Sequence, residues 1–271
     1  MNPISKRHLF SLSCAALLAL ASTQIAYAAE TPSFGSIIGD DFKHTVTAPS
    51  RWESNEWENL GWATLAVVGV SVIADAPVRD FMRRQTPGNS FLGTVENFGQ
   101  PYAFDLMATY YLVGVISDDE KTIRVSQDLI AASMVTAGIN QTIKTATSRS
   151  RPRDNQGTGD FQGYTQIQNN SSFPSGHATE AFTLAAVLSA HYEETWVSVT
   201  TYSIAGLVGV ARMYHDAHFA SDVTASALIG IFVGKSIVSH NSTLRGNSAN
   251  KLVLLPEVTS DYAGMRIVGN F

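Results

Sequence analysis

A loop that leads into a predicted helix carries residues able to bind an anion. The stretch "SFPSGHATE" at residues 172–180 places Ser175, Gly176 and His177 directly before the apolar helical pattern "AFTLAAVLSA". The first backbone N–H groups of a helix have no partner within it, and the helix dipole adds positive potential there. Gly176 leaves room for an anion, Ser175 can cap or donate, and His177 can supply a proton. The stretch predicts an anion site, with a plain N-cap and an incidental histidine as the alternative.

An upstream stretch adds two cations. "KTATSRSRP" places Lys144 at the end of an apolar helix and Arg151 seven positions later, directly before Pro152. Because a residue before proline disfavours the helical conformation, the helix should end by Arg151 and turn both cations toward one place. Arg149 and Arg153 flank Arg151 outside this spacing, and we expect them to form a solvated basic run.

A downstream stretch adds a third cation, a second histidine and a carboxylate. "ARMYHDAHFASD" contains Arg212, then His218 after five residues, then Asp222 after three more. If Asp222 opens the next helix, its carboxylate can cap that end and also hold one ring nitrogen of His218. With Lys144 and Arg151, Arg212 could surround the oxygens of an anion with charge-assisted hydrogen bonds. The pattern indicates a cationic site for an anion.

The three motifs together resemble the type 2 phosphatidic acid phosphatase superfamily, which includes lipid phosphate phosphatases, bacterial class A nonspecific acid phosphatases and vanadium haloperoxidases. Its motifs are lysine, six residues, arginine-proline; proline-serine-glycine-histidine; and serine-arginine, five residues, histidine, three residues, aspartate. They correspond in order to residues 144–152, 174–177 and 212–222. Ala211 stands where the family has serine, which removes one hydroxyl that could steady the phosphate or the arginine.

The resemblance implies a phosphoric ester or diphosphate hydrolase with divided roles. His218 would attack phosphorus and form a phosphohistidine, Asp222 would fix its tautomer, and His177 would protonate the leaving oxygen and later activate water. The implied phosphate-binding residues are Lys144, Arg151, Ser175, Gly176 and Arg212. No metal or other cofactor is implied, because the cationic side chains take its place. A bound phosphate dianion would raise the pKa of His177, which the helix dipole lowers.

Residues near these motifs are open to two interpretations. His215 and Asp216 could tune the pH response, but we expect them to be solvated loop residues. "HDAH" resembles a histidine metal pair, yet no carboxylate cluster accompanies it, so we expect no metal there. The polar stretch "RDNQGTGDFQGYTQIQNNSS" separates the first two motifs. Its Phe161 and Tyr164 could contact an organic leaving group or pack the loop down.

The elements that must position these residues are mainly helical. Apolar stretches long enough for helices, with few alternating patterns, predict a mainly α protein: a helical bundle with its active site at helix ends and loops. These stretches are 60–76, 104–117, 129–144, 181–190, 197–212 and 222–238. The last 21 residues place two short β-prone runs around "SDYAG" and predict a C-terminal hairpin.

The N-terminus has the parts of a secretory signal. Lys6 and Arg7 precede a short apolar run and "AYA" at 26–28, so we expect cleavage after Ala28 and a periplasmic or secreted chain. The expected organisation is a signal peptide at 1–28, an irregular lead-in at 29–55, a helical phosphatase domain at 56–245 and a tail at 246–271. Cys14, the only cysteine, lies in the leader, which excludes disulfides and cysteine nucleophiles from the mature chain.

The composition limits the kinds of partner that the protein can bind, but it does not identify the substrate. Net charge is −5, and it becomes −7 without the leader, so nucleic acid is excluded as a partner. The apolar runs fall short of the roughly 20 continuous residues of a membrane span, which favours a soluble bundle, while contact with a membrane surface stays open. Trp52, Trp57 and Trp62 could be an interfacial belt or, more plainly, core aromatics.

Two alternatives to a phosphatase remain. One is vanadate-dependent haloperoxidase chemistry in the same site, because vanadate copies the geometry of phosphate in transfer. The other is a non-catalytic envelope protein that binds phosphate or lipid headgroups. The sequence leaves the substrate, lipid or soluble, and the oligomeric state undetermined.

Overall fold

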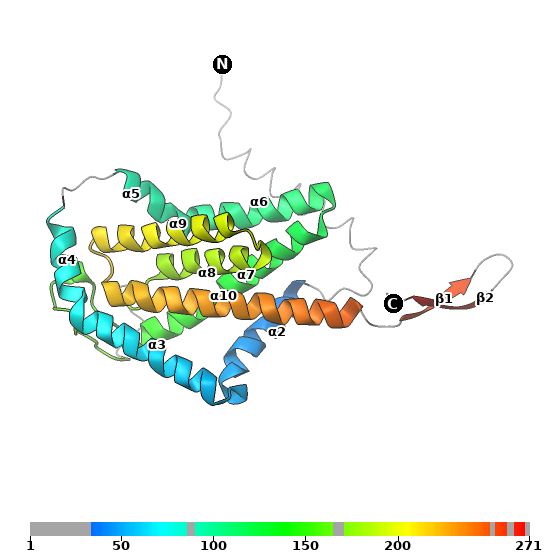
Figure 1. Ribbon diagram of the computed structural model, residues 1–271, viewed down its shortest axis with the longest axis horizontal. Coiled ribbons are helices and arrows are strands. Elements are labelled where there is room, and N and C mark those ends of the chain that lie inside the picture. The colour runs from blue at the N-terminus through cyan, green and yellow to red at the C-terminus, as the bar shows by residue number, and fades with distance from the viewer. Residues whose placement is uncertain (1–33, 86–89, 165–170, 250–252, 259–262, 269–271) are drawn as a thin grey trace, which may run out of the picture. The chain divides into compact units, whose positions relative to one another are not determined.

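The computed structural model describes residues 34–85, 90–164, 171–249, 253–258 and 263–268, and the predicted signal peptide lies outside these ranges. The described chain is mainly helical (Figure 1). In chain order the elements are α2 (Phe34–Thr47), η2 (Ala48–Arg51), α3 (Ser54–Ile73), α4 (Asp75–Arg83), α5 (Ser90–Val95), η3 (Glu96–Gly99), α6 (Pro101–Ser117), α7 (Glu120–Thr147), η4 (Pro152–Asp154), α8 (Gly176–His191), α9 (Thr195–Tyr214), α10 (Ala220–Ala249), β1 (Val253–Val258) and β2 (Ala263–Val268).

The predicted fold class is confirmed. Each of the six apolar stretches lies in a helix, although the first one breaks at Ala74 between α3 and α4. The predicted C-terminal hairpin is also present, with β1 antiparallel to β2 and Val253 paired with Val268. Helix α10 runs to Ala249, four residues past the expected domain boundary at residue 245.

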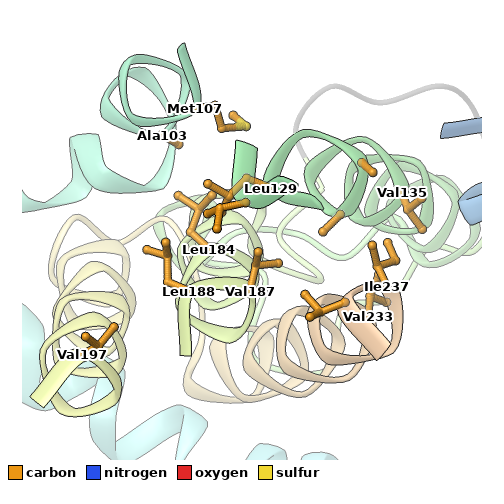
Figure 2. Close-up of a cluster of buried hydrophobic side chains, with 14 residues drawn as sticks. Ala103, Met107, Leu129, Val135, Leu184, Val187, Leu188, Val197, Val233 and Ile237 are labelled. Atoms are coloured by element: carbon orange, nitrogen blue, oxygen red, sulfur yellow. The ribbon is translucent and has the colours of Figure 1, made fainter. Parts of the chain in front are cut away.

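Helix α8 lies at the centre of the bundle, among α7, α9 and α10 (Figure 1). Its apolar residues are spread all round rather than along one stripe, which is the pattern of a helix enclosed by other helices. One side contributes Leu184, Val187 and Leu188 to the main core, where Figure 2 shows them meeting side chains of α7 and α10. The other side contributes Ala181 and Ala185 to a second cluster with α9.

Two glycines of α10 allow this helix to approach α8 closely. A Cβ at Gly230 would lie 2.7 Å from the carbonyl oxygen of Thr179, and one at Gly234 would lie 2.8 Å from the Cβ of Ala186. Any larger side chain at these positions would push the helices apart. The close contact fixes the start of α10 beside the start of α8, where two of the three motifs lie.

The interpretation of residues 29–55 as irregular is wrong, because α2 and η2 occupy most of the described part of this segment. Ile38 of α2 packs against the main core, and a polar contact also holds this helix. The fully buried Asp41 accepts a hydrogen bond of 3.1 Å from Asn241 of α10, which also donates to Asp128 of α7 at 2.9 Å.

Helix α3 exposes the apolar side chains that it carries. None of its residues is buried, and Trp57 and Trp62 are 51% and 70% exposed, so the interpretation of these tryptophans as core aromatics is wrong. By length and composition alone, within the described residues, α10 could cross a membrane over Ala220–Gly246, and the bent pair α3–α4 could form a second span.

Candidate active site

The helix start predicted from "PSGH" is present at α8. Ser175 is the N-cap, and its hydroxyl accepts a hydrogen bond of 3.4 Å from the N–H of Ala178. Ser175 is fully buried, and its own N–H donates to Ser226 at 2.7 Å. The hydroxyl therefore caps the helix as an acceptor, and its contact with phosphate stays a prediction. Gly176 and His177 follow in the first turn, where backbone N–H groups have no helical acceptor.

Lys144 lies in the last turn of α7, and its Nζ donates to the carbonyl oxygen of Ser171 at 2.7 Å. The helix ends at Thr147, so the prediction that it ends by Arg151 is confirmed. Burial, with the added charge of Arg151 and Arg212, lowers the pKa of Lys144 to about 8. The three predicted cations are close enough to affect one another.

Arg212 lies in the last turn of α9 and contacts an acidic residue that the sequence did not single out. Its Nη1 is 2.6 Å from Oε2 of Glu96 in η3, and the same oxygen is 2.7 Å from Nδ1 of His215. His215 is thus tied to Arg212 through Glu96, rather than being the solvated loop residue that we expected. The Nε of Arg212 is buried without a hydrogen-bond partner among the described residues.

Asp216 is also held in place, contrary to the expectation of a solvated loop residue. Arg83 of α4 pairs with it at 2.8 Å and donates to the carbonyl oxygen of Pro152 at 2.6 Å. The backbone of Asp216 has a φ of 53°, and its carbonyl oxygen accepts from the N–H of Arg153. This contact joins the first motif to the third.

His218 is 4% exposed and lies just before α10. Its Nδ1 is 2.6 Å from the carbonyl oxygen of Ser172 and 3.6 Å from Oδ2 of Asp222. The carbonyl is therefore the direct partner of the ring, and Asp222 acts on it as a nearby charge. If Nδ1 carries the proton, Nε2 presents its lone pair. Burial, opposed by Asp222, lowers the pKa of His218 to about 4, so the ring is neutral at pH 7.

Asp222 caps α10, as its position predicted. Its Oδ2 accepts a hydrogen bond of 2.8 Å from the N–H of Phe219, three residues earlier. Its Oδ1 is 2.5 Å from Nη1 of Arg149. Burial alone would raise the pKa of Asp222, but His218 and Arg149 outweigh it and hold the carboxyl ionised.

Arg149 is the main correction to the predicted site. It is 1% exposed, so the interpretation as part of a solvated basic run is wrong. Its guanidinium bridges Asp222 to Asp75 of α4, at 2.5 and 2.7 Å, and lies against the rings of Phe161 and Phe219, with centroid distances of 4.8 and 4.3 Å. Phe161 therefore packs the loop down, the second of its two expected roles.

His177 is surrounded by the three predicted cations. Burial is the largest cause that lowers the pKa of His177, and the charge of Arg212 is the next. With smaller effects of Arg151 and Lys144, they lower this pKa to about 4. The backbone of η3 packs against it closely, because a Cβ at Gly99 would lie 2.7 Å from the Cβ of His177. The structure thus brings both histidines and all three cations together at the ends of α7, α8 and α9.

Asp75 and Glu96 are the residues that sequence reasoning missed. Asp75 is the only acidic residue in the apolar stretch 60–76, which is a signal for a buried, paired carboxylate. Glu96 has no comparable signal, because it lies in a short 3-10 turn far along the chain from Arg212.

The low pKa of Lys144 leads to a test of its charge. Above about pH 8 Lys144 loses its proton, so kcat/KM for nitrophenyl phosphate should fall in the wild type. In Lys144→Arg the cation persists, and we expect this alkaline fall to disappear from the accessible pH range. Steady-state kinetics from pH 5 to about 10 measure it, with Arg153→Lys as the control. An unchanged alkaline limb in Lys144→Arg would assign the limb to another group.

The described helical bundle gathers three cations and two histidines near a helix start whose first backbone N–H groups have no helical acceptor. Residues 128–244 match the model of the PAP2 superfamily. The predicted resemblance is confirmed, and the assignment agrees with the predicted enzyme class, a phosphoric ester hydrolase.

Individual relatives match parts of the chain. A lipid A 1-phosphatase of Porphyromonas gingivalis is 39% identical over 67 residues, which are 24% of this chain and 15% of that protein. The chain thus aligns with about one seventh of this curated relative. Among solved structures, the phosphatidylglycerolphosphate phosphatase of Bacillus subtilis has a TM-score of 0.51 at 18% identity, over 68% of this chain and 94% of its own, and shares the fold. LpxE of Aquifex aeolicus is 27% identical with a TM-score of 0.46, over 60% and 93%.

Proposed function

We propose that the protein is a metal-independent phosphatase that hydrolyses phosphomonoesters or lipid-linked phosphates and diphosphates through a phosphohistidine. The observation that carries this proposal is the convergence of a buried, neutral His218 with His177 and three cations. A neutral imidazole whose Nδ1 is held by a carbonyl has its Nε2 lone pair available for attack. The cations stabilise the charge on the transferring phosphoryl group.

In the first step, Nε2 of His218 forms a bond to phosphorus while the bond from phosphorus to the leaving oxygen breaks. His177 gives its proton to that oxygen. The positive charge that develops on His218 is stabilised by Asp222, 3.6 Å from its Nδ1. Arg151, Arg212 and Lys144 would bind the phosphoryl oxygens, together with the N–H groups of Gly176 and His177.

In the second step, His177 takes a proton from water, whose oxygen attacks phosphorus as the bond to His218 breaks. Inorganic phosphate is released and His218 returns to the neutral state, while the proton that His177 took from water passes to solvent as phosphate leaves. With its pKa lowered to about 4, His177 is unprotonated in the free protein at pH 7. The dianionic substrate raises this pKa when it binds, so His177 becomes protonated in the complex with substrate.

Apolar surfaces near the site support a lipid-linked substrate at a membrane surface. A cavity of about 450 Å³ with mainly apolar lining lies between α3 and α10 and reaches Phe173 and Ser221, each adjacent to a motif residue. Helix α3 also exposes Leu65, Val68 and Val72. The relative named lipid A 1-phosphatase supports the same substrate class. A periplasmic or secreted location remains part of this proposal, resting on the predicted leader.

The proposal is tested by measuring the release of inorganic phosphate from a matched panel of soluble and lipid phosphate esters. Purified protein with excess chelator should hydrolyse nitrophenyl phosphate and at least one lipid phosphate, such as phosphatidic acid in mixed micelles. Arg212→Ala should lower kcat/KM by about 30- to 1000-fold, since it removes a transition-state donor. No turnover of any ester would favour a phosphate-binding envelope protein. Peroxide-dependent halide oxidation after loading with vanadate would identify a haloperoxidase.

A further inference from the structure

A second cavity, of about 340 Å³, opens beside the predicted phosphate site between α7 and α8. Lys144 and Gly176 belong to both the cavity and the phosphate site. Asn140, one turn before Lys144 on α7, and Glu180, one turn after Gly176 on α8, also line it. Its volume lies at the small end of the range for small-molecule pockets, about 300–1,000 Å³.

Asn140 presents an unused hydrogen-bond acceptor in this wall. The residue is 6% exposed, and its Nδ2 donates to the hydroxyl of Thr179 at 3.2 Å. Its Oδ1 is buried and has no partner among the described residues. Because a buried polar atom without a partner is costly, such an atom beside a cavity indicates a ligand that supplies a donor.

Glu180 presents a second polar group in the same cavity. Its carboxyl accepts a hydrogen bond of 2.6 Å from the hydroxyl of Ser133, also a lining residue. Burial raises the pKa of Glu180 above its ordinary value. A buried carboxyl is stabilised when a ligand hydroxyl or amine forms a hydrogen bond to it.

The cavity lies near His177, the proposed acid that would protonate the leaving oxygen. Gly99 packs directly against His177, the proposed acid, and the next residue, Gln100, lines the cavity. The mainly apolar 450 Å³ cavity is instead lined by Ser221 and Phe173, close to the nucleophile His218. The two cavities therefore flank the site from different sides.

We propose that the 340 Å³ cavity is a subsite for the leaving alcohol, and that it selects alcohols whose carbon skeleton carries hydroxyl or amino groups, such as a sugar or another polyol. Asn140 Oδ1 and Glu180 accept hydrogen bonds from these groups. This inference rests on the proposed phosphatase function and names the class of its substrate.

Two ring-shaped substrates test the subsite: glucose 1-phosphate, and cyclohexyl phosphate, which has the same ring size without hydroxyl groups. The measured quantity is the ratio of their kcat/KM values. In Asn140→Leu and Glu180→Gln we expect the ratio to fall by about tenfold or more, the scale of one lost hydrogen bond to a buried group. Thr142→Val, on an exposed turn of α7, is the control and should keep the wild-type ratio.

The outcomes separate the subsite from the phosphatase activity. If the wild type hydrolyses both esters and the ratio is unchanged in both cavity variants, the subsite is refuted while the function stands. If neither ester turns over, calorimetric binding of glucose 1-phosphate still tests the subsite, since both variants should bind it about tenfold more weakly. Equal binding there would also refute it. An alkyl glucoside phosphate tested beside the free sugar phosphate shows whether the group comes from a lipid headgroup.

Discussion

His218→Ala is expected to abolish turnover, with kcat lower by about 10⁴-fold or more, and to prevent any phosphoenzyme from forming. The buried ring is neutral at pH 7, and its Nδ1 is fixed 2.6 Å from the carbonyl oxygen of Ser172, so its Nε2 is the group placed to attack. Brief incubation with a ³²P-labelled ester, an alkaline quench and gel electrophoresis measure the acid-labile label. Label on the His218 variant at the wild-type level would reopen His215 as the nucleophile.

His177→Ala provides the matched contrast, because it removes the proposed acid and keeps the nucleophile. We expect nitrophenyl phosphate, whose leaving group departs without a proton, to be affected far less than an alkyl phosphate. Label should accumulate in this variant, since activation of water uses the same ring. Equal losses for both esters would show that His177 is not the acid.

Site residues whose positions are set by their neighbours in the sequence could be predicted. Residues that contact the site from distant parts of the chain could not. The start of α8 and the end of α7 are set by neighbouring residues: Ser175 caps one, and the segment before Pro152 ends the other. Glu96 reaches Arg212 across 116 positions, and no periodicity records such a pairing. The buried pair of Asp41 and Asn241, which helps to hold α2, is likewise separated by 200 positions.

Arg149 shows why a motif alone misjudges its neighbours. Outside the family spacing, in "SRSRP", it looks like a surface cation. The fold surrounds it with two carboxylates and two aromatic rings, which only tertiary structure brings together. Its charge holds Asp222 ionised, and Asp222 in turn stabilises His218. Arg149 is therefore a positioning residue for the nucleophile as well as a structural one.

Arg149→Met should be the most destabilising single change near the site. It leaves Asp75 and Asp222 buried without their cation, and breaking a buried ion pair in this way costs about 3–5 kcal/mol. Urea unfolding followed by circular dichroism measures the free energy of unfolding. Arg153→Met, at an exposed position four residues away, is the control and should change it by no more than about 0.5 kcal/mol.

The pH dependence of kcat/KM separates positioning from stability. Arg149 lowers the pKa of Asp222, whereas burial raises it. In a variant that weakens the contact between Arg149 and Asp222, the pKa of Asp222 should therefore rise, and the carboxyl should take up a proton at higher pH than in the wild type. The acid limb of the profile should therefore move to higher pH. Arg149→Lys keeps a charge but cannot bridge both carboxylates with one planar group, so it should fold and still show the shift. A folded Arg149→Lys with the wild-type acid limb would leave Arg149 only a structural role, because the charge of Asp222 would then not depend on it.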